Sequence, residues 1–397
     1  MSERNRIDWF LFIVAAGLAL FGSAMVYSAS AMISLRETQS ATQFSYFYKQ
    51  FGFTLVGLAV MFAASRVDYR IFNDPRIVYA AIGLTVVLLL AVFAFPDING
   101  ARRWIRFGGF SFQPSELAKI ALPLFLAFFL SRREGSIGDF RATVLPCVIV
   151  LGLLGGLVFL EPDLGTTIVL CAVFASVYFA AGARIVHLLP VAGGLILLGV
   201  GALIFAPWRL RRLAAFLDPC DPENAAGAGY QVCQSLYAIG SGGLFGEGFG
   251  KGEQKLFYLP YPYSDFIFSV VGEELGLAGT LAVVIAFGVL LWRGTRAALR
   301  AADNFGMLLA FGLITGIVVQ ALFNISVVIS ILPAKGIPLP FISYGGTSVV
   351  VTLFAVGILL NISASGAAER RSYATARSEP AVRKRKKAGA SLRSGNR

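Results

Sequence analysis

Residues 305–332 read FGMLLAFGLITGIVVQALFNISVVISIL, without one charged side chain. About 20 apolar residues in a helix cross the hydrocarbon core of a bilayer, so this stretch predicts a transmembrane helix. With 57% apolar residues, 14% charged residues and a mean hydropathy of +0.74, a soluble globular protein is excluded. We expect an all-α, polytopic integral membrane protein with about ten transmembrane helices. The candidate spans are 9–30, 51–64 (the weakest by length), 77–95, 115–130, 142–160, 164–182, 186–206, 267–292, 305–332 and 341–363.

The first run, 9–30, also has features of a secretory signal peptide, because the small residues Ser28–Ala31 close it. Its apolar stretch is longer than the roughly 7–15 residues of the apolar region of a signal peptide, and nine further candidate spans follow. We therefore interpret it as a retained first helix.

Basic residues indicate which side of the membrane each loop occupies, because Lys and Arg are enriched in short cytoplasmic loops. With a cytoplasmic N-terminus, the short cytoplasmic segments hold more basic residues than the short outer loops. An even number of spans then places the C-terminus in the cytoplasm as well. This topology gives a membrane domain at 1–363, which includes one large extracytoplasmic loop at 207–264, and a basic, disordered cytoplasmic tail at 364–397.

The net charge of +12 calls for no nucleic-acid partner, because the cytoplasmic loops and the tail carry the excess of basic residues. The run Arg383–Lys387 predicts attraction of the tail to anionic membrane lipids or to an acidic partner. Cys220 and Cys233 share the long outer loop, where they either pair under oxidising conditions or remain free thiols. A single histidine rules out a His-based triad and a His-rich metal site.

A cluster of charged residues lies around the expected second outer loop. Arg102, Arg103 and Arg106 reach the membrane interface, and Glu116 and Lys119 begin the next span. Glu116 and Lys119 are three residues apart, so they share a helix face and can neutralise one another. An ordinary interfacial cluster with one ion pair is the alternative, but a lysine inside an apolar helix is a candidate functional residue.

Two acids, Glu161 and Asp163, lie in a tight helix–helix turn with Pro162 between them. Asp163 is placed to cap the helix that starts at Leu164. Capping explains Asp163 but leaves Glu161 without an explanation.

The last outer connection, 332–348, is rich in proline and glycine. Such non-helical backbone at membrane depth is tolerated only where protein or a water-filled cavity covers it. It therefore predicts a polar cavity, with the Ser343 hydroxyl as a candidate lining group. Gln320 and Asn324 in the preceding span either line this cavity or join helices, and we favour the second role.

Asp265 differs from the two acids that follow it in PYPYSDFIFSVVGEELG. It lies at the start of a helix, where the positive end of the helix dipole favours a carboxylate. Glu273 and Glu274 lie roughly 12–14 Å further along the helix, so they are expected to fix it to its neighbours. Asp265 is the best candidate for a general base.

Taken together, these segments resemble the SEDS family (shape, elongation, division and sporulation), which includes the FtsW and RodA proteins. The motifs that carry the resemblance occur in family order across nearly the whole membrane region. They are NGARRWIRFGGFSFQPSELAK at 99–119, EPDLGT at 161–166, GSGGLFGEGFGKGEQK at 240–255, DFIFSVVGEELG at 265–276 and LPAKGIPLPFISYGGTS at 332–348. The basic tail and the glycine-rich motif are more similar to the FtsW branch than to RodA.

The resemblance implies a ten-helix peptidoglycan glycosyltransferase that polymerises lipid II on the outer face of the bacterial cytoplasmic membrane. It implies that Asp265 is the catalytic aspartate, acting as general base or as ligand of a divalent cation, Mg²⁺ or Mn²⁺. Lys119 with Arg102, Arg103 or Arg106 would stabilise the departing pyrophosphate. We expect Glu116, Glu161 and Asp163 to hold these cations in place, and no organic cofactor is implied.

The chain departs from the family just before this aspartate. The family usually has PEPHTDFIF, whereas this chain has Tyr261 and Tyr263 where the family has Glu and His. The aspartate is retained, whereas the two side chains that differ cannot perform the acid–base chemistry of the family's Glu and His near neutral pH.

The implied partners are lipid II, a class B penicillin-binding protein transpeptidase, other membrane proteins of the divisome and membrane lipids. The FtsW-like features favour septal wall synthesis, with an elongation-type RodA polymerase as the alternative. A lipid II flippase and a non-enzymatic division scaffold are the rival functions. The acids and broken helices gather on one side rather than at the midplane, and no internal repeat is evident, which argues against a transporter.

Overall fold

The computed structural model describes residues 7–367 apart from 40–41, 98–99, 108–109, 184–185, 187–188, 190–192, 195–200 and 202–214. Its long helices are α1 (Trp9–Glu37), α2 (Ser45–Arg66), α3 (Pro75–Ala91), α4 (Pro114–Ser131), α5 (Leu145–Leu160), α6 (Leu164–Ala180), α11 (Ile267–Leu299), α12 (Asn304–Val328) and an unlabelled C-terminal helix, Gly346–Ala367. Shorter elements are η1 (Tyr69–Asn73), η2 (Val92–Ala94), η3 (Glu134–Ser136), the π-helical turn η4 (Phe140–Val144), α9 (Pro222–Ala225) and α10 (Tyr230–Ser241).

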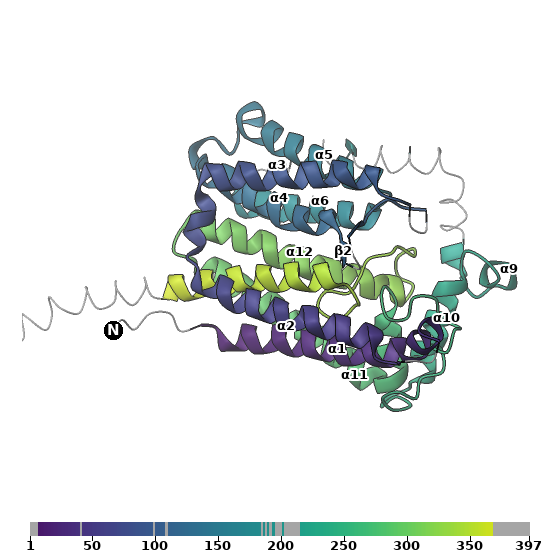
Figure 1. Cartoon of the computed structure of the whole chain (residues 1–397). Coiled ribbons are helices and arrows are strands. Elements are labelled where there is room, and N and C mark those ends of the chain that lie inside the picture. The colour runs from purple at the N-terminus through teal and green to yellow at the C-terminus, as the bar shows by residue number, and fades with distance from the viewer. Residues whose placement is uncertain are drawn as a thin grey trace, which may run out of the picture.

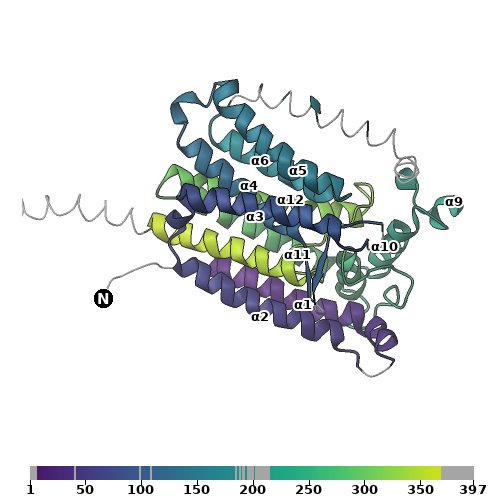
Figure 2. The same cartoon turned by 45° about the horizontal axis from the view of Figure 1, so that its top comes forward.

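Helix α12 lies at the centre of the bundle and packs against α11, α4 and α6 (Figure 1). Helices α1 and α2 join α11 on one side, and α3 and α5 pack on α4 and α6 on the other. Figure 2 shows α5 and α6 as an outer layer beyond α4 and α12. In α4, α12 and the C-terminal helix, 72% of the apolar window is buried inside the protein, against 22% in α3. The apolar surface of α3 therefore needs lipid as its solvent.

The predicted all-α membrane fold is confirmed, with small differences. Eight described helices are long and apolar enough to span a membrane, and α6 is a shorter apolar helix at a ninth predicted span. The predicted span 186–206 lies largely outside the described residues. The expected second outer loop contains a small antiparallel hairpin, β1 (Ile105–Phe107) and β2 (Phe110–Phe112), in which Arg106 pairs with Ser111.

Both described ends of the chain lie at one end of the bundle, where α1 begins and the C-terminal helix ends (Figure 1). The β hairpin, α9, α10 and the start of α11 lie at the opposite end. A disulfide joins Cys220 to Cys233 in α10. Of the two states left open for these cysteines, the structure has the paired one.

Candidate active site

Asp265 lies at the mouth of α11, immediately before the N-cap residue Phe266. Its side chain is partly exposed, and the Ser264 hydroxyl donates a 2.9 Å hydrogen bond to Oδ1. The placement at the start of the helix agrees with the sequence prediction, and the dipole of α11 favours negative charge there.

The main chain around Asp265 is attached to the proline-rich segment 332–348. Asn324 of α12 donates 2.7 Å hydrogen bonds to the carbonyl oxygens of both Asp265 and Ile337. The Ser343 hydroxyl donates to the Ser264 carbonyl at 2.6 Å and accepts from the Leu339 amide at 2.7 Å. These contacts fix the position of Asp265 while leaving its carboxylate accessible.

The predicted lining residue Ser343 therefore has a different role from the one expected. Ser343 is only 2% exposed, and both of its hydrogen bonds join protein segments, so it supports the loop rather than facing a cavity. Gly336 approaches the site instead, because a Cβ atom there would lie 2.9 Å from Oδ2 of Asp265. The sequence assigned Gly336 no role at the site, because its approach to Asp265 brings together residues that are far apart along the chain. Such a contact leaves no pattern in the sequence around the glycine.

Arg103 is the arginine that the structure brings to Asp265. Its guanidinium donates to the carbonyl oxygens of Glu161 and Pro162, at 3.1 Å for Glu161. Its charge is close enough to lower the pKa of the Asp265 carboxyl. The main chain of the α5–α6 turn thus orients this cation.

Arg102 and Arg106 have other environments. The Arg102 guanidinium donates to the Phe93 carbonyl at 3.1 Å, which attaches it to η2. Arg106 is exposed on β1. The predicted three-arginine cluster is therefore divided, and Arg103 is the member that acts electrostatically on Asp265.

The turn acids Glu161 and Asp163 are buried and differ in function. Asp163 caps α6 by accepting from the Thr166 amide at 3.1 Å, as predicted, and it also accepts from Gln113. The carboxylate of Glu161 has no hydrogen-bond partner among the described residues. Glu161 binds Arg103 through its main-chain carbonyl, and the expected role of its carboxylate in holding a cation stays a prediction.

Burial sets the protonation of both acids at the site. Burial raises the pKa of Asp265 to about 6, the Ser264 hydrogen bond and the Arg103 charge lower it, and the Asp163 charge raises it. Burial raises the pKa of Glu161 to about 8, with a further increase from Asp163 and a decrease from Arg103. At pH 7 Asp265 is therefore mostly ionised, whereas Glu161 is mostly neutral.

Lys119 lies inside the bundle and has two partners. Its ammonium forms the expected ion pair with Glu116, at 2.8 Å, and donates to Oε1 of Gln320 at 2.5 Å. Gln320 in turn donates to the Pro338 carbonyl at 2.8 Å. Lys119 is 9% exposed, so in this conformation it supports the 332–348 segment and does not face solvent beside Asp265.

Glu273 and Glu274 hold the loop that precedes Asp265, as predicted for residues that fix α11 to its neighbours. Glu273 accepts from the amides of Glu253 and Gln254 at 2.6 and 2.9 Å. Glu274 forms a buried ion pair with Lys255 at 2.5 Å, and its Oε1 also accepts from Ser28 of α1 at 2.6 Å. Sequence reasoning missed Lys255 and Ser28, because their partner is remote along the chain.

Two tyrosines pack against Tyr263, the residue that replaces the family histidine. The rings of Tyr46 and Tyr344 lie 4.7 and 5.7 Å from that of Tyr263. The Tyr344 amide donates to the Tyr263 carbonyl at 2.9 Å. Tyr263 thus packs into an aromatic cluster beside Asp265. The sequence marked Tyr263 as unusual, because the family has His at this position of PEPHTDFIF. It did not predict that Tyr46 and Tyr344 would pack against the Tyr263 ring.

The acids of the described residues do not assemble a cluster of three or more metal-ligating side chains. Mg²⁺ is often held by one or two carboxylates together with substrate phosphates and water. The single carboxylate of Asp265 is enough for a site of that kind. A cation bound there would need substrate oxygens to complete its coordination.

Comparisons with known proteins identify relatives of this chain in sequence and in fold. A family model for FtsW, RodA and SpoVE, described as cell cycle protein, matches residues 8–367. The probable peptidoglycan glycosyltransferase FtsW of Geobacter metallireducens is 42% identical over 373 residues, which cover 91% of this chain and 96% of that protein. Stage V sporulation protein E of Bacillus subtilis is also 42% identical, over 91% of this chain and 98% of that protein.

Two solved structures share the fold and 28% of the sequence. The rod shape determining protein RodA of Thermus thermophilus matches with a TM-score of 0.65, covering 90% of this chain and 97% of that one. A chain from a structure titled "Structural coordination of polymerization and crosslinking by a peptidoglycan synthase complex" matches with a TM-score of 0.74, covering 91% and 98%. By sequence, motif order and fold, this chain belongs to the FtsW/RodA/SpoVE family.

Proposed function

We propose that this protein is a peptidoglycan glycosyltransferase that polymerises lipid II, with Asp265 as its general base. The observation that carries the proposal is the environment of Asp265. Its main chain is fixed to α12 and to the 332–348 segment, while its partly exposed carboxylate has a pKa of about 6. A base with a pKa slightly below the working pH is ionised and still accepts a proton effectively. The Geobacter metallireducens relative, a probable peptidoglycan glycosyltransferase, supports the same reaction.

In this mechanism Asp265 removes the proton from the 4-hydroxyl of the acceptor sugar. The oxygen attacks the anomeric carbon of the donor, a C–O bond forms, and the bond to the lipid pyrophosphate breaks. The leaving pyrophosphate gains negative charge, which the Arg103 guanidinium is placed to stabilise. An α-linked donor gives a β-linked glycan, so one displacement with inversion needs one base and no covalent intermediate.

Lys119 and Glu116 contribute to this reaction indirectly in the present geometry. Their ion pair reaches the 332–348 segment through Gln320, and that segment holds Asp265. A direct contact of Lys119 with pyrophosphate needs a rearrangement that frees its ammonium. Glu161 stays neutral beside Arg103 and therefore leaves the positive charge of Arg103 available to the substrate.

A divalent cation, Mg²⁺ or Mn²⁺, would be held by Asp265 and pyrophosphate oxygens. When bound, it would supply positive charge to the leaving group and lower the pKa of a coordinated hydroxyl. Removal of cations with EDTA, followed by Mg²⁺ or Mn²⁺ addition, distinguishes this role of Asp265 from that of a simple base.

We propose that the end of the bundle with Asp265 faces the outer side of the bacterial cytoplasmic membrane and that both termini are cytoplasmic. The disulfide between Cys220 and Cys233 supports this orientation, because disulfides persist in oxidising compartments. The excess of basic residues in the opposite loops supports it as well.

We further propose a class B penicillin-binding protein as the partner and the division septum as the place of action. The structural relative from a peptidoglycan synthase complex that couples polymerisation with crosslinking supports the first point. The similarity to proteins named FtsW supports the second.

The decisive experiment measures glycan polymerisation from lipid II by the purified protein, with and without its transpeptidase partner. We expect Asp265→Asn to lower the rate by about 10²–10⁴-fold. Glu247→Gln is the matched control, because Glu247 is exposed and lies in the glycine-rich loop at the same end. Polymerisation by Asp265→Asn at the wild-type rate would exclude the catalytic assignment. If even the wild type with its partner formed no glycan, the polymerase function would be wrong and lipid flipping would gain support.

A further inference from the structure

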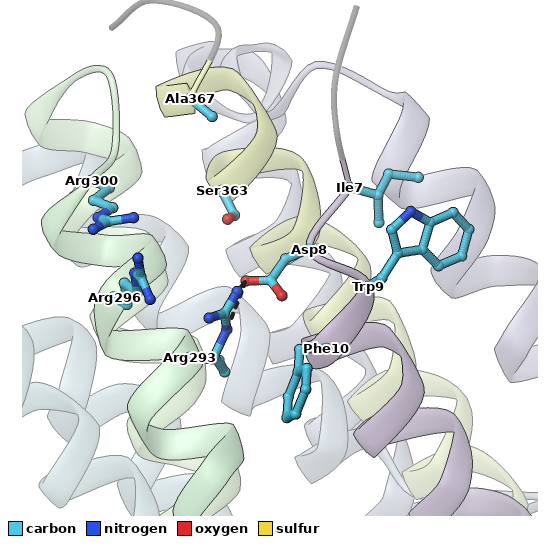
Figure 3. A pocket seen from close by; sticks show the side chains of 9 residues that line it. All are labelled: Ile7, Asp8, Trp9, Phe10, Arg293, Arg296, Arg300, Ser363 and Ala367. Carbon is cyan, nitrogen blue, oxygen red and sulfur yellow. Dashed lines mark hydrogen bonds and ion pairs between the residues drawn. The ribbon is translucent and has the colours of Figure 1, made fainter.

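A hollow that the site at Asp265 does not include lies at the opposite end of the bundle. It measures about 530 Å³ and is bordered by the start of α1, the last turns of α11 and the C-terminal helix (Figure 3). The proposed glycosyl transfer does not use it. Its described lining residues are Ile7, Asp8, Trp9, Phe10, Arg293, Arg296, Arg300, Ser363 and Ala367.

The wall formed by α11 is strongly basic. Arg293, Arg296 and Arg300 follow helical spacing and therefore share one face of α11. Asp8 accepts two hydrogen bonds from the Arg293 guanidinium, at 3.0 and 2.5 Å, which neutralises that arginine (Figure 3). The guanidinium groups of Arg296 and Arg300 form no hydrogen bond or ion pair within the described part of the chain, and that of Arg296 lies 5.9 Å from the centre of the Trp292 ring. Two positive charges thus remain available in the hollow.

A second hollow of about 480 Å³ is bordered by the same two arginines. It is lined by Trp292, Thr295, Arg296, Leu299 and Arg300. Arg296 and Arg300 therefore line both hollows, so an anion in either hollow would lie near two guanidinium groups. Guanidinium groups match phosphate oxygens in planar, bidentate geometry.

The surroundings of the hollow place it at the membrane–water interface. Helix α11 has 33 residues and a kink at Gly276, and the part after the kink, 277–299, spans about 35 Å, slightly more than the roughly 30 Å of the hydrocarbon core. Trp9 and Trp292 are 58% and 57% exposed at this end of the bundle. Exposed tryptophans are enriched at the level of the lipid headgroups.

We propose that this hollow binds the phosphate headgroup of an anionic phospholipid, with Arg296 and Arg300 as its phosphate ligands. The Ser363 hydroxyl projects into the same space and provides a further donor (Figure 3). Phe10 and Leu299, which are 60% and 66% exposed, offer apolar surface to the acyl chains. A soluble anion has no acyl chains to cover this apolar surface, whereas a phospholipid does. The apolar surface therefore favours a lipid over free phosphate.

The proposal is tested by native mass spectrometry of the full-length protein in detergent, titrated with phosphatidylglycerol or phosphatidylcholine. We expect the wild type to retain phosphatidylglycerol preferentially. Because each basic residue near an anionic headgroup contributes roughly a fivefold factor, Arg296→Gln with Arg300→Gln should weaken its binding by about 25-fold. Arg66→Gln with Arg76→Gln is the matched control, since both arginines are exposed and lie near the same end outside the hollow.

Two further arms make the result unambiguous. Unfolding temperatures without added lipid show whether the double variant is folded, and Arg296→Lys with Arg300→Lys should retain most of the binding, because the charge is kept. Inorganic phosphate or glycerol phosphate at millimolar concentration should not displace the lipid. Equal retention of the two lipids, equal loss in the control variant, or full displacement by free phosphate would each overturn the proposal.

Discussion

The pH dependence of polymerisation tests the electrostatic reasoning at Asp265 most directly. With a pKa of about 6, the ionised fraction of this carboxyl is about 9% at pH 5, 50% at pH 6 and 91% at pH 7. If the ionised form is the base, the initial rate should rise about tenfold between pH 5 and pH 7 and then level off. Initial rates from lipid II at saturating concentration, measured over this range, give the profile.

Ser264 provides the perturbation. Its hydroxyl donates to Oδ1 of Asp265 at 2.9 Å and stabilises the ionised form. A hydrogen bond to a charged group contributes about 1.5 kcal/mol, which corresponds to about one pH unit. Ser264→Ala should therefore move the midpoint of the profile from about 6 to about 7. The rate at pH 6 should fall about fivefold relative to wild type, while the rate at pH 8.5 should hardly change.

Glu247→Gln serves as the control and should leave the midpoint in place, because Glu247 is exposed and is not among the groups that shift the pKa of Asp265. A flat profile between pH 5 and pH 7 would refute the assignment of Asp265 as a titrating base. An equal loss at every pH in Ser264→Ala would show that Ser264 acts by positioning the loop and not by stabilising the carboxylate.

The remaining predictions concern stability, measured as unfolding temperature of the purified protein. Lys255→Met leaves Glu274 buried without its cation and should lower the free energy of unfolding by about 3–5 kcal/mol. Adding Glu274→Gln removes the unpaired charge and should restore most of this loss. Equal losses in the single and the double variant would contradict the ion-pair argument. Burial raises the pKa of Glu161 from its ordinary value of 4.5 to about 8, so its neutral form stabilises the folded protein at low pH. This stabilisation is lost as the pH rises through about 8, and the unfolding temperature of the wild type should therefore decline between pH 5 and pH 9. Glu161→Gln cannot ionise and should flatten this decline. A wild-type slope retained in the variant would contradict this. Gly276→Ala should destabilise by more than about 1 kcal/mol, because Gly276 has φ +66° and a Cβ would lie 2.4 Å from the Gly246 amide nitrogen. Gly288→Ala in the same helix has no neighbour within 4 Å and should be neutral or stabilising, so equal effects at the two glycines would refute the close-contact argument.

Features set by local backbone geometry were predictable from the sequence. The apolar runs predicted the membrane-spanning helices, because a helix forms all the hydrogen bonds of its backbone N–H and C=O groups internally where no water is present. The three-residue spacing of Glu116 and Lys119 gave their ion pair, and the position of Asp163 gave its cap. Asp265 was identified for a similar reason, since its place at a helix start follows from the residues beside it.

Features that depend on the path of the loops were not predictable. Lys255 meets Glu274 because the 242–255 loop folds back over the kink of α11, where the Leu277 amide donates to the Gly243 carbonyl. Ser343 was expected to line a cavity but joins two segments, because the proline-rich connection turns towards Ser264. Neither path leaves a periodic pattern in the sequence.

The acids at the Asp265 end of the bundle differ in what they are free to do. Glu116 and Glu274 are paired with lysines, Glu273 accepts from main-chain amides, and Asp163 caps a helix. Glu161 is fully buried and neutral near pH 7. Asp265 is held differently, since Asn324 and Ser343 bind the main chain of residues 264 and 265 and leave the carboxylate one short contact, with Ser264. A general base needs a fixed position together with an unoccupied oxygen, and Asp265 combines the two because its supports are attached to the backbone.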